Sequence, residues 1–284
     1  MIAVLKTAVR QAALTAQRPD GSFYQSLSYA HAQSIATQSG VTLREVEIAA
    51  LEAGIFPRRY ARNGTTLNPN QQATLLKSSV AVAGLGGLGG PVVETLARLG
   101  VGGLTLIDGD AFEETNLNRQ LLSTVVNIGA SKALCASRRV AQINPAVQVR
   151  VEARNLNAEN AEALLTGANL VMDCLDNLPD RFTLEAGARR SCLPLVSAAV
   201  GGTSGQLTVV YPQDEGLQLI YGSPQAAPRH GIEARLGTLP QTVLTLAGLA
   251  CNEALKILLG SDTGLRRRLL ILDLMDNRFD VVEL

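Results

Sequence analysis

The chain has 284 residues, 46% of them hydrophobic and 4% aromatic, which is enough for one large core or a core with a small accessory domain. Its 25 basic residues balance its 25 acidic ones, so no overall field attracts nucleic acid or anionic lipid. No signal peptide and no apolar run near the roughly 18 residues of a membrane span is found. We therefore expect a globular cytoplasmic protein that holds any charged ligand by a local cluster.

The first part of the chain, residues 1–57, is predicted to be a helical extension without strands. Gly40 and Gly54 are placed to end two of its helices, and Thr42 with Glu45 has the spacing of a capping box. The stretch "IATQSGVTLREVEIAALEAG" also resembles a helix-turn-helix. It has few Lys or Arg residues to contact DNA phosphates, so DNA binding is the less favoured interpretation.

From Ser79 onward, apolar strand candidates alternate with helical patterns. The strand candidates are "VAVAG", "LTLID", "VQVRV", "NLVMDC" and "PLVSAAV". Such an alternation predicts an α/β fold with a Rossmann-like, doubly wound and mostly parallel sheet covered on both faces. After residue 200 come "QLTVVY", a polar irregular stretch, a helix at "PQTVLTLAGLACNEALKILLG", and two final strands, "RRLLILDLM" and "RFDVVEL". We expect these last strands to extend the sheet in antiparallel fashion.

A glycine-rich segment follows the first of these strands. Gly84, Gly86 and Gly89 fit the pattern G-x-G-x-x-G, and Gly87 adds a further glycine. Glycine lets the backbone turn sharply and approach a phosphate, while the amino end of the following helix supplies free N–H groups. Asp108 ends the next strand, where an acid normally accepts hydrogen bonds from ribose hydroxyls. This unit predicts a nucleotide site, either for a nicotinamide dinucleotide or for ATP.

The segment after Asp108 favours ATP. Its polar residues are Asn116, Arg119, Gln120 and Lys132, in a loop that starts at the carboxyl end of a parallel strand, where such sheets bind ligands. A dinucleotide whose two phosphates already rest on backbone N–H groups has little use for them. A triphosphate, with about two more charges to neutralise, does.

Together these segments resemble the ThiF, MoeB and HesA family and its relatives, the adenylation domains of ubiquitin-activating enzymes. The motifs "GLGGLGG", "LTLIDGDAFEETNLNRQ", "GASKA" and "DCLDN" occur in the family's order, and "RRYARN" resembles its R-Y-x-R-Q segment. The resemblance runs from about Arg58 to the end of the chain. It implies an adenylation domain over 58–284, with a nucleotide-binding core at about 79–200 and a crossover and C-terminal part at about 201–284.

The resemblance implies a role for each matching residue. The glycine loop and Asp108 would bind the nucleotide, and the residues implied at its phosphates are Asn116, Arg119 and Lys132. Gln120 would support the phosphates indirectly, as a partner of the residues that bind them. Asp176, in "DCLDN", would lie at the Mg²⁺ ion and the α-phosphate. Arg62 would complete the nucleotide site of the partner subunit in a homodimer. The implied catalytic set is Arg62, Arg119, Lys132 and Asp176.

The implied reaction joins the C-terminal glycine carboxylate of a small ubiquitin-like sulfur carrier, similar to ThiS or MoaD, to AMP, with ATP and Mg²⁺ as cofactors and release of pyrophosphate. A carboxylate is ionised at pH 7 and needs no general base, which agrees with a chain whose only histidines are His31 and His230. A peptide terminus is another possible acceptor, and thiamine, molybdopterin and other sulfur pathways are not distinguished. A nicotinamide-dependent oxidoreductase and a non-catalytic nucleotide-binding scaffold remain the alternatives.

The chain departs from the family in its cysteines. Relatives commonly carry two C-x-x-C pairs for zinc, but the four cysteines here are far apart, so we expect no zinc. Many relatives also have a cysteine in the crossover, where this chain has Gly231 and no thiol nearby. The sequence thus predicts adenylation without covalent transfer, with sulfur delivered directly to the acyl-adenylate. Packing roles in a reducing compartment are expected for Cys135, Cys174, Cys192 and Cys251.

Overall fold

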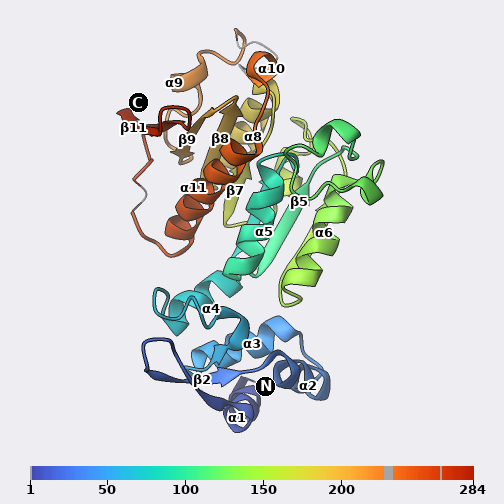
Figure 1. Ribbon diagram of the computed structural model, residues 1–284, viewed down its shortest axis with the longest axis vertical. Coiled ribbons are helices and arrows are strands. Elements are labelled where there is room, and N and C mark those ends of the chain that lie inside the picture. The colour runs from blue at the N-terminus through green and yellow to red at the C-terminus, as the bar shows by residue number, and fades with distance from the viewer. Residues whose placement is uncertain (1, 227–232, 263) are drawn as a thin grey trace.

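The computed structural model describes residues 2–226, 233–262 and 264–284. Its larger part is built on an eight-stranded sheet in the order β11-β10-β9-β8-β7-β4-β5-β6 (Figure 1). The parallel strands are β4 (Ser79–Ala83), β5 (Gly103–Ile107), β6 (Gln148–Glu152), β7 (Leu170–Asp173) and β8 (Leu195–Gly201). The antiparallel strands are β9 (Ser204–Val210), β10 (Arg268–Asp273) and β11 (Arg278–Glu283). The predicted strands and the antiparallel extension of the sheet are confirmed.

Helices cover both faces of this sheet. One face packs against α5 (Gly89–Leu99), α6 (Lys132–Ile143) and α11 (Pro240–Leu258), and the other against α7 (Ala161–Leu165) and α8 (Leu178–Arg190). In β4, Val80 and Val82 enter the first core while Ala81 and Ala83 enter the second. Burial on both faces explains why β4 is continuously apolar. Two short helices, α9 (Gln218–Tyr221) and α10 (Glu233–Leu236), lie in the stretch predicted to be irregular. No described helix is long and apolar enough to cross a membrane.

The order of the strands places a crevice between β4 and β7. From β4 the chain adds β5 and β6 on one side, and then returns to add β7 and β8 on the other. In open parallel sheets, ligands bind where the direction of winding reverses in this way, outside the carboxyl ends of the strands. The glycine loop follows β4, and the "DCLDN" motif includes the end of β7.

The N-terminal extension contains strands, so the prediction that residues 1–57 form helices alone is wrong. Its helices are α1 (Ile2–Ala12), α2 (Tyr29–Ser39) and α3 (Leu43–Glu52), and its strands are β1 (Leu14–Gln17), β2 (Phe23–Leu27) and β3 (Phe56–Pro57). The predicted turn "RPDGS" joins β1 and β2 as a hairpin, with Gly21 at a φ of 84°. β2 also pairs with β3, a non-local contact that no local pattern reports.

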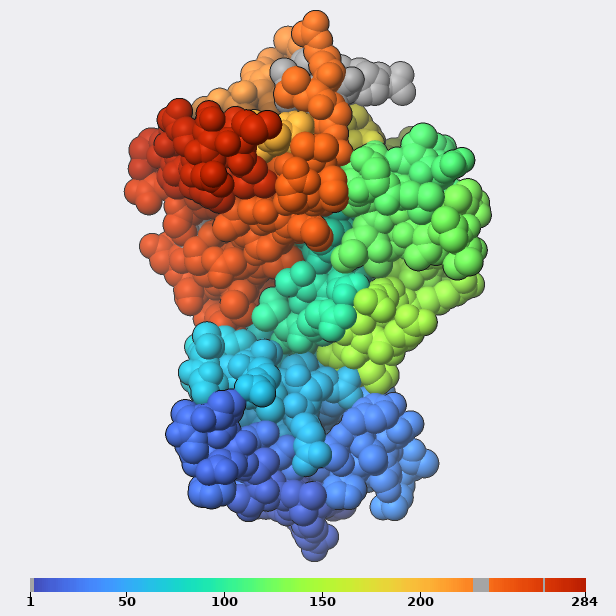
Figure 2. All heavy atoms as spheres, viewed as in Figure 1, coloured from blue at the N-terminus to red at the C-terminus, as the bar shows by residue number. Residues whose placement is uncertain are grey.

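The predicted ends of the N-terminal helices are confirmed. Gly40 ends α2 in the left-handed conformation, with a φ of 64°. Thr42 and Glu45 form the expected capping box at the start of α3. The extension gathers in a lobe at one end of the molecule (Figure 2), and α4 (Pro69–Lys77) lies between this lobe and the large sheet (Figure 1).

A buried polar cluster joins the extension to the large core. Glu47 of α3 pairs with Arg59, whose Nη2 lies 3.1 Å from its Oε1. Arg59 also donates to Oδ1 of Asn144, the C-cap of α6, at 2.6 Å. The Asn144 amide donates to Tyr60 Oη at 2.8 Å and to the Ala97 carbonyl of α5 at 2.9 Å. The extension is therefore fixed to α5 and α6, two of the helices whose amino ends lie at the crevice.

This cluster predicts a pH dependence of stability. Burial raises the pKa of Glu47 to about 7, although Arg59 opposes the shift. The folded protein thus holds this proton more tightly than the unfolded chain, and the contribution is complete below the ordinary pKa of 4.5 and lost as the pH rises through 7. The slope is at most about 1.4 kcal/mol per pH unit. Urea unfolding between about pH 5 and about pH 7 should show a fall in stability with rising pH in the wild type, and a clearly shallower fall in Glu47→Gln.

Glu52→Gln is the matched control. Hydrogen bonding to Lys77 lowers the pKa of Glu52, so that carboxylate stays ionised in both states across the same range and should leave the slope unchanged. A wild-type slope that persists in Glu47→Gln would contradict the prediction.

Candidate active site

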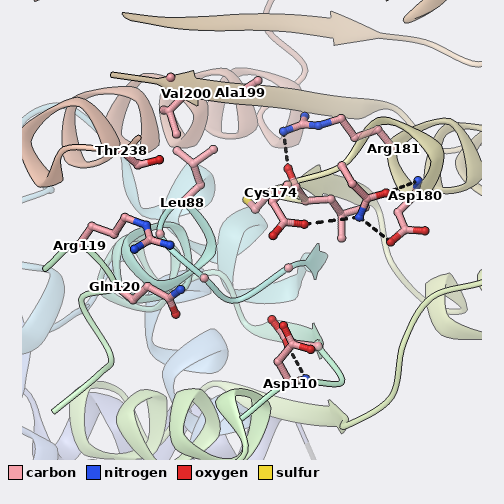
Figure 3. A pocket seen from close by; sticks show the side chains of 18 of the residues that line it. Leu88, Asp110, Arg119, Gln120, Cys174, Asp180, Arg181, Ala199, Val200 and Thr238 are labelled. Atoms are coloured by element: carbon pink, nitrogen blue, oxygen red, sulfur yellow. Dashed lines mark hydrogen bonds between the residues drawn. The ribbon is translucent and has the colours of Figure 1, made fainter. Parts of the chain in front are cut away.

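One cavity of about 1170 Å³ occupies the crevice at the carboxyl ends of the strands. One part of it is lined by the loops after β4, β5, β6 and β7, and the other part by β8, β9, β10 and the segment before α11. Arg119 and Gln120 lie side by side on one side of the view, with Asp180 and Arg181 across from them (Figure 3). The cavity therefore joins a region lined by the residues predicted to bind a nucleotide to a second region beyond it.

The glycine loop is shaped by two close backbone contacts. Gly84 has a φ of 84°, and a Cβ there would lie 2.6 Å from the Cys174 carbonyl oxygen. A Cβ on Gly89 would lie 1.8 Å from the Gly84 carbonyl oxygen. Gly86 and Gly87 line the cavity itself. The glycine loop and the amino end of α5 thus lie at the cavity, where backbone N–H groups and the helix dipole favour an anion.

Asp108 lies directly after β5 and lines the same cavity. Its carboxylate accepts hydrogen bonds from the Leu85 and Asp110 backbone N–H groups, each at 2.7 Å. Burial raises the pKa of Asp108, and these two hydrogen bonds act against that shift. The carboxylate is thereby oriented beside the glycine loop, where hydroxyl donors of a ribose could reach it.

Lys132 is the first residue of α6, and its side chain is only 9% exposed. Its Nζ lies 3.1 Å from Oδ2 of Asp110, whose side chain is 65% exposed. A buried ammonium in a cavity provides a strong local positive charge, because little water screens it. The structure therefore brings Lys132 to the cavity, as predicted for a phosphate ligand.

Of the residues in the loop before α6 that were predicted to lie at or near the phosphates, some line the cavity and one does not. Arg119 and Gln120 line the cavity. Oε1 of Gln120 is buried and has no hydrogen-bond partner among the described residues, which leaves an acceptor available to a ligand. Asn116 does not line the cavity: it is buried, and its Oδ1 accepts from the Glu113 N–H at 3.0 Å. As placed here, Asn116 stabilises its own turn.

Asp176 lines the cavity as an exposed carboxylate in the turn after β7. It is not the N-cap of α8, because Asn177 takes that position and accepts from the Asp180 N–H. Arg62 is exposed and lies between β3 and α4, outside the lining of the cavity. A single chain therefore brings together all the predicted catalytic residues except Arg62.

Comparison with known proteins places the chain in a family. The model of the ThiF family matches residues 60–284. The chain belongs to the ThiF family. It is 36% identical over 230 residues to the SAMP-activating enzyme E1 of Haloferax volcanii, covering 79% of this chain and 84% of that protein. It is 35% identical over 222 residues to the sulfur carrier protein adenylyltransferase of Thermus thermophilus, covering 75% and 81%. This ThiF-family protein is accordingly an adenylyltransferase.

Solved structures agree with the ThiF fold. Escherichia coli MccB with succinimide superposes with a TM-score of 0.66 at 19% identity, covering 89% of this chain and 82% of that one. Escherichia coli TcdA, a tRNA N6-threonylcarbamoyladenosine dehydratase in complex with ATP, gives 0.60 at 24% identity, covering 72% and 94%. The predicted Rossmann-like fold is confirmed.

Sequence reasoning missed several polar residues of this ThiF-family cavity. Arg154 and Asn155 follow β6 and line the cavity. Their place at the carboxyl end of a parallel strand is the same signal that identified Asp108, so that rule could have found them. Arg181 also lines the cavity but lies inside α8. No local pattern distinguishes such a helix residue.

Some of the four cysteines, but not all, have the buried surroundings expected of packing residues. Cys174 and Cys251 are buried, and burial raises the pKa of both thiols, that of Cys251 to about 12, which disfavours the reactive thiolate. Cys135 is partly buried, whereas Cys192 is exposed. Gly231 and His230 lie outside the described residues, so the prediction about the crossover stays a prediction.

The glycine loop gives a test with an internal standard. Gly84 and Gly129 share a φ of 84°, but a Cβ on Gly129 would have no neighbour within 4 Å. Gly129→Ala should cost only the backbone strain, about 1–2 kcal/mol. Gly84→Ala should cost clearly more and weaken nucleotide binding, because it also pushes against the Cys174 carbonyl. Urea unfolding and calorimetric titration with ATP would measure the two effects, and equal losses in both variants would show that this contact is unimportant.

Proposed function

We propose that this enzyme joins the C-terminal glycine carboxylate of a small ubiquitin-like sulfur carrier protein to AMP, with release of pyrophosphate. The observation that carries the proposal is the continuous cavity that links the glycine loop, Asp108 and Lys132 to a second region lined in part by small residues. The named activities of the Haloferax and Thermus relatives support the same reaction class. Adenylation requires both regions, because nucleotide and acceptor must meet at one phosphorus atom.

The second region suits an acceptor with an unbranched end. Ala199, Gly201 and Gly205, on β8 and β9, contribute to its lining. These small residues leave room for an extended backbone beside the larger residues of the lining, such as Val200 and Ile271. A terminal glycine fits this shape, and its carboxylate could approach the nucleotide from this side.

The reaction as proposed needs no proton transfer. A carboxylate oxygen of the acceptor attacks the α-phosphorus of ATP, the bond from that phosphorus to the bridging oxygen breaks, and pyrophosphate leaves with the electron pair. The developing charge is on the departing phosphates, so fixed positive charge is the main requirement. Lys132 and Arg119 provide it from this chain, and Arg62 would add to it from a partner subunit.

The residues present fit a Mg²⁺ ion if the phosphates of ATP supply part of its ligands. The described part of the chain has no group of three His, Cys, Asp or Glu residues that could hold a metal ion by themselves. Mg²⁺ is usually held by one or two carboxylates together with substrate phosphates and water. Asp176, an exposed carboxylate at the cavity, would be such a ligand, and the ion would neutralise phosphate charge. Absence of zinc and of covalent carrier transfer are further parts of the proposal.

Nucleotide identity is the first thing to test. Calorimetric titration should show saturable binding of Mg²⁺-ATP and none of NAD⁺ or NADH. Lys132→Ala should lose ATP binding because it removes the buried charge, while Arg138→Ala, an exposed position on the same helix, should bind like the wild type. Binding of the dinucleotides without ATP would replace the proposal with an oxidoreductase.

The homodimer is tested by mixing two defective variants. Arg62→Ala and Asp176→Ala should each bind Mg²⁺-ATP poorly. If Arg62 acts in the partner's site, a mixed dimer has one intact site, so random exchange of equal amounts should restore about one quarter of the sites. Calorimetric stoichiometry would count them, with native mass spectrometry to verify exchange. Exchange without restored sites would place Arg62 outside the partner's site.

A further inference from the structure

A buried polar cluster lies behind the turn that carries Asp176. Nη1 of Arg181 donates to Oδ2 of Asp173 at 2.8 Å and to Oγ of Ser197 at 3.3 Å, and the Ser197 hydroxyl donates to the same Asp173 oxygen at 2.6 Å. The side chains of Arg181 and Asp173 are 5% and 0% exposed. The cluster thus connects α8 with the end of β7 and with the neighbouring parallel strand β8.

The cluster forms hydrogen bonds with both backbone groups of Leu175, the residue before Asp176. The Leu175 N–H donates to Oδ1 of Asp173 at 3.1 Å, and its carbonyl accepts a short hydrogen bond from Nη2 of Arg181. On the other side of Asp176, the Asn177 side chain accepts from the Asp180 N–H at 2.9 Å and caps α8. Asp176 is exposed, but its backbone lies between two fixed neighbours.

The same turn supports the glycine loop. The Cys174 N–H donates to the Ala83 carbonyl at 2.9 Å, and the Cys174 carbonyl oxygen lies only 2.6 Å from where a Cβ of Gly84 would be. A change in this turn would therefore move both the carboxylate and the wall of the phosphate site. Figure 3 shows the hydrogen bond from Arg181 toward the turn that contains Cys174.

We propose that Arg181 is a positioning residue for the magnesium-bound triphosphate, an inference that rests on the proposed function. Its guanidinium holds the Asp173 carboxylate and the Leu175 carbonyl together, and so fixes the direction in which Asp176 enters the cavity. A buried ion pair adds little net stability compared with apolar packing of the same volume. We attribute the buried ion pair between Arg181 and Asp173 to its control of the geometry of this turn.

Arginine suits this task better than lysine. Its planar guanidinium donates to several acceptors in fixed directions, whereas an ammonium is a compact point charge. Arg181→Lys keeps the charge that Asp173 requires but cannot reproduce the fork that also reaches Leu175. The substitution thus separates geometry from charge.

Arg189→Lys is the matched control on the same helix. Arg189 donates to the Pro212 and Asp214 carbonyls and to Glu185, a similar fork, but it does not line the cavity. Both variants should lower the melting temperature. Calorimetry with Mg²⁺-ATP, and with AMP in EDTA, then distinguishes a positioning role from a structural one.

For Arg181→Lys we expect Mg²⁺-ATP affinity to fall about tenfold, the size of loss seen when a supporting partner of a metal site is removed. AMP binding in EDTA should stay within about twofold, since it requires no metal ligand. Arg189→Lys should change neither. An unchanged Mg²⁺-ATP affinity in Arg181→Lys, or an equal loss in both variants, would overturn the proposal.

Two further results keep the test decisive. If Arg181→Lys fails to fold, Ser197→Ala removes two hydrogen bonds from the cluster, those to Arg181 and Asp173, without a change of charge and should weaken Mg²⁺-ATP binding in the same direction; unchanged affinity there would overturn the proposal. A wild-type protein that binds no ATP would instead refute the proposed function itself.

Discussion

The nucleotide site depends on the contact between two turns at the centre of the sheet. Gly84 after β4 and Cys174 after β7 approach so closely that no side chain fits between them. Each turn is also fixed by a hydrogen bond to a carboxylate: the Leu85 N–H donates to Asp108, and the Leu175 N–H donates to Asp173. A parallel sheet supplies the general position of a ligand site. These backbone contacts convert that position into a defined cavity with an anion-binding wall.

Charge in the cavity is arranged locally, as a chain of zero net charge requires. Arg181 is neutralised by Asp173 within the cluster behind the turn, so it contributes shape and little net field. Arg119 lines the cavity and, among the described residues, donates hydrogen bonds only to oxygens of its own loop, at Thr115 and Asn118. The positive charge that a phosphate would meet therefore includes Arg119, Lys132 and the amino end of α5.

How much could be predicted from the sequence depended on whether the signal was local. The strands of the large sheet were predictable because burial on both faces makes them continuously apolar, and the glycine loop because its backbone demands are specific to glycine. β1 to β3 were missed because they are short and β2 pairs with a strand far along the chain. The family motif identified Asn116 but not its orientation, which its own turn determines. Arg181 and Ser197 come together only in the folded chain.

The pair formed by Lys132 and Asp110 shows how such a site can accept its ligand. Lys132 is buried and needs an anionic partner, because an unpaired buried ammonium is costly. Asp110 is largely exposed, so water can replace the Lys132 ammonium beside its carboxylate. Losing such an exposed ion pair costs about 1 kcal/mol of free energy or less. A phosphate could therefore replace Asp110 beside Lys132 without leaving either charge unsatisfied. The lysine is held in place in advance, and the exchangeable member of the pair is the one that faces the solvent.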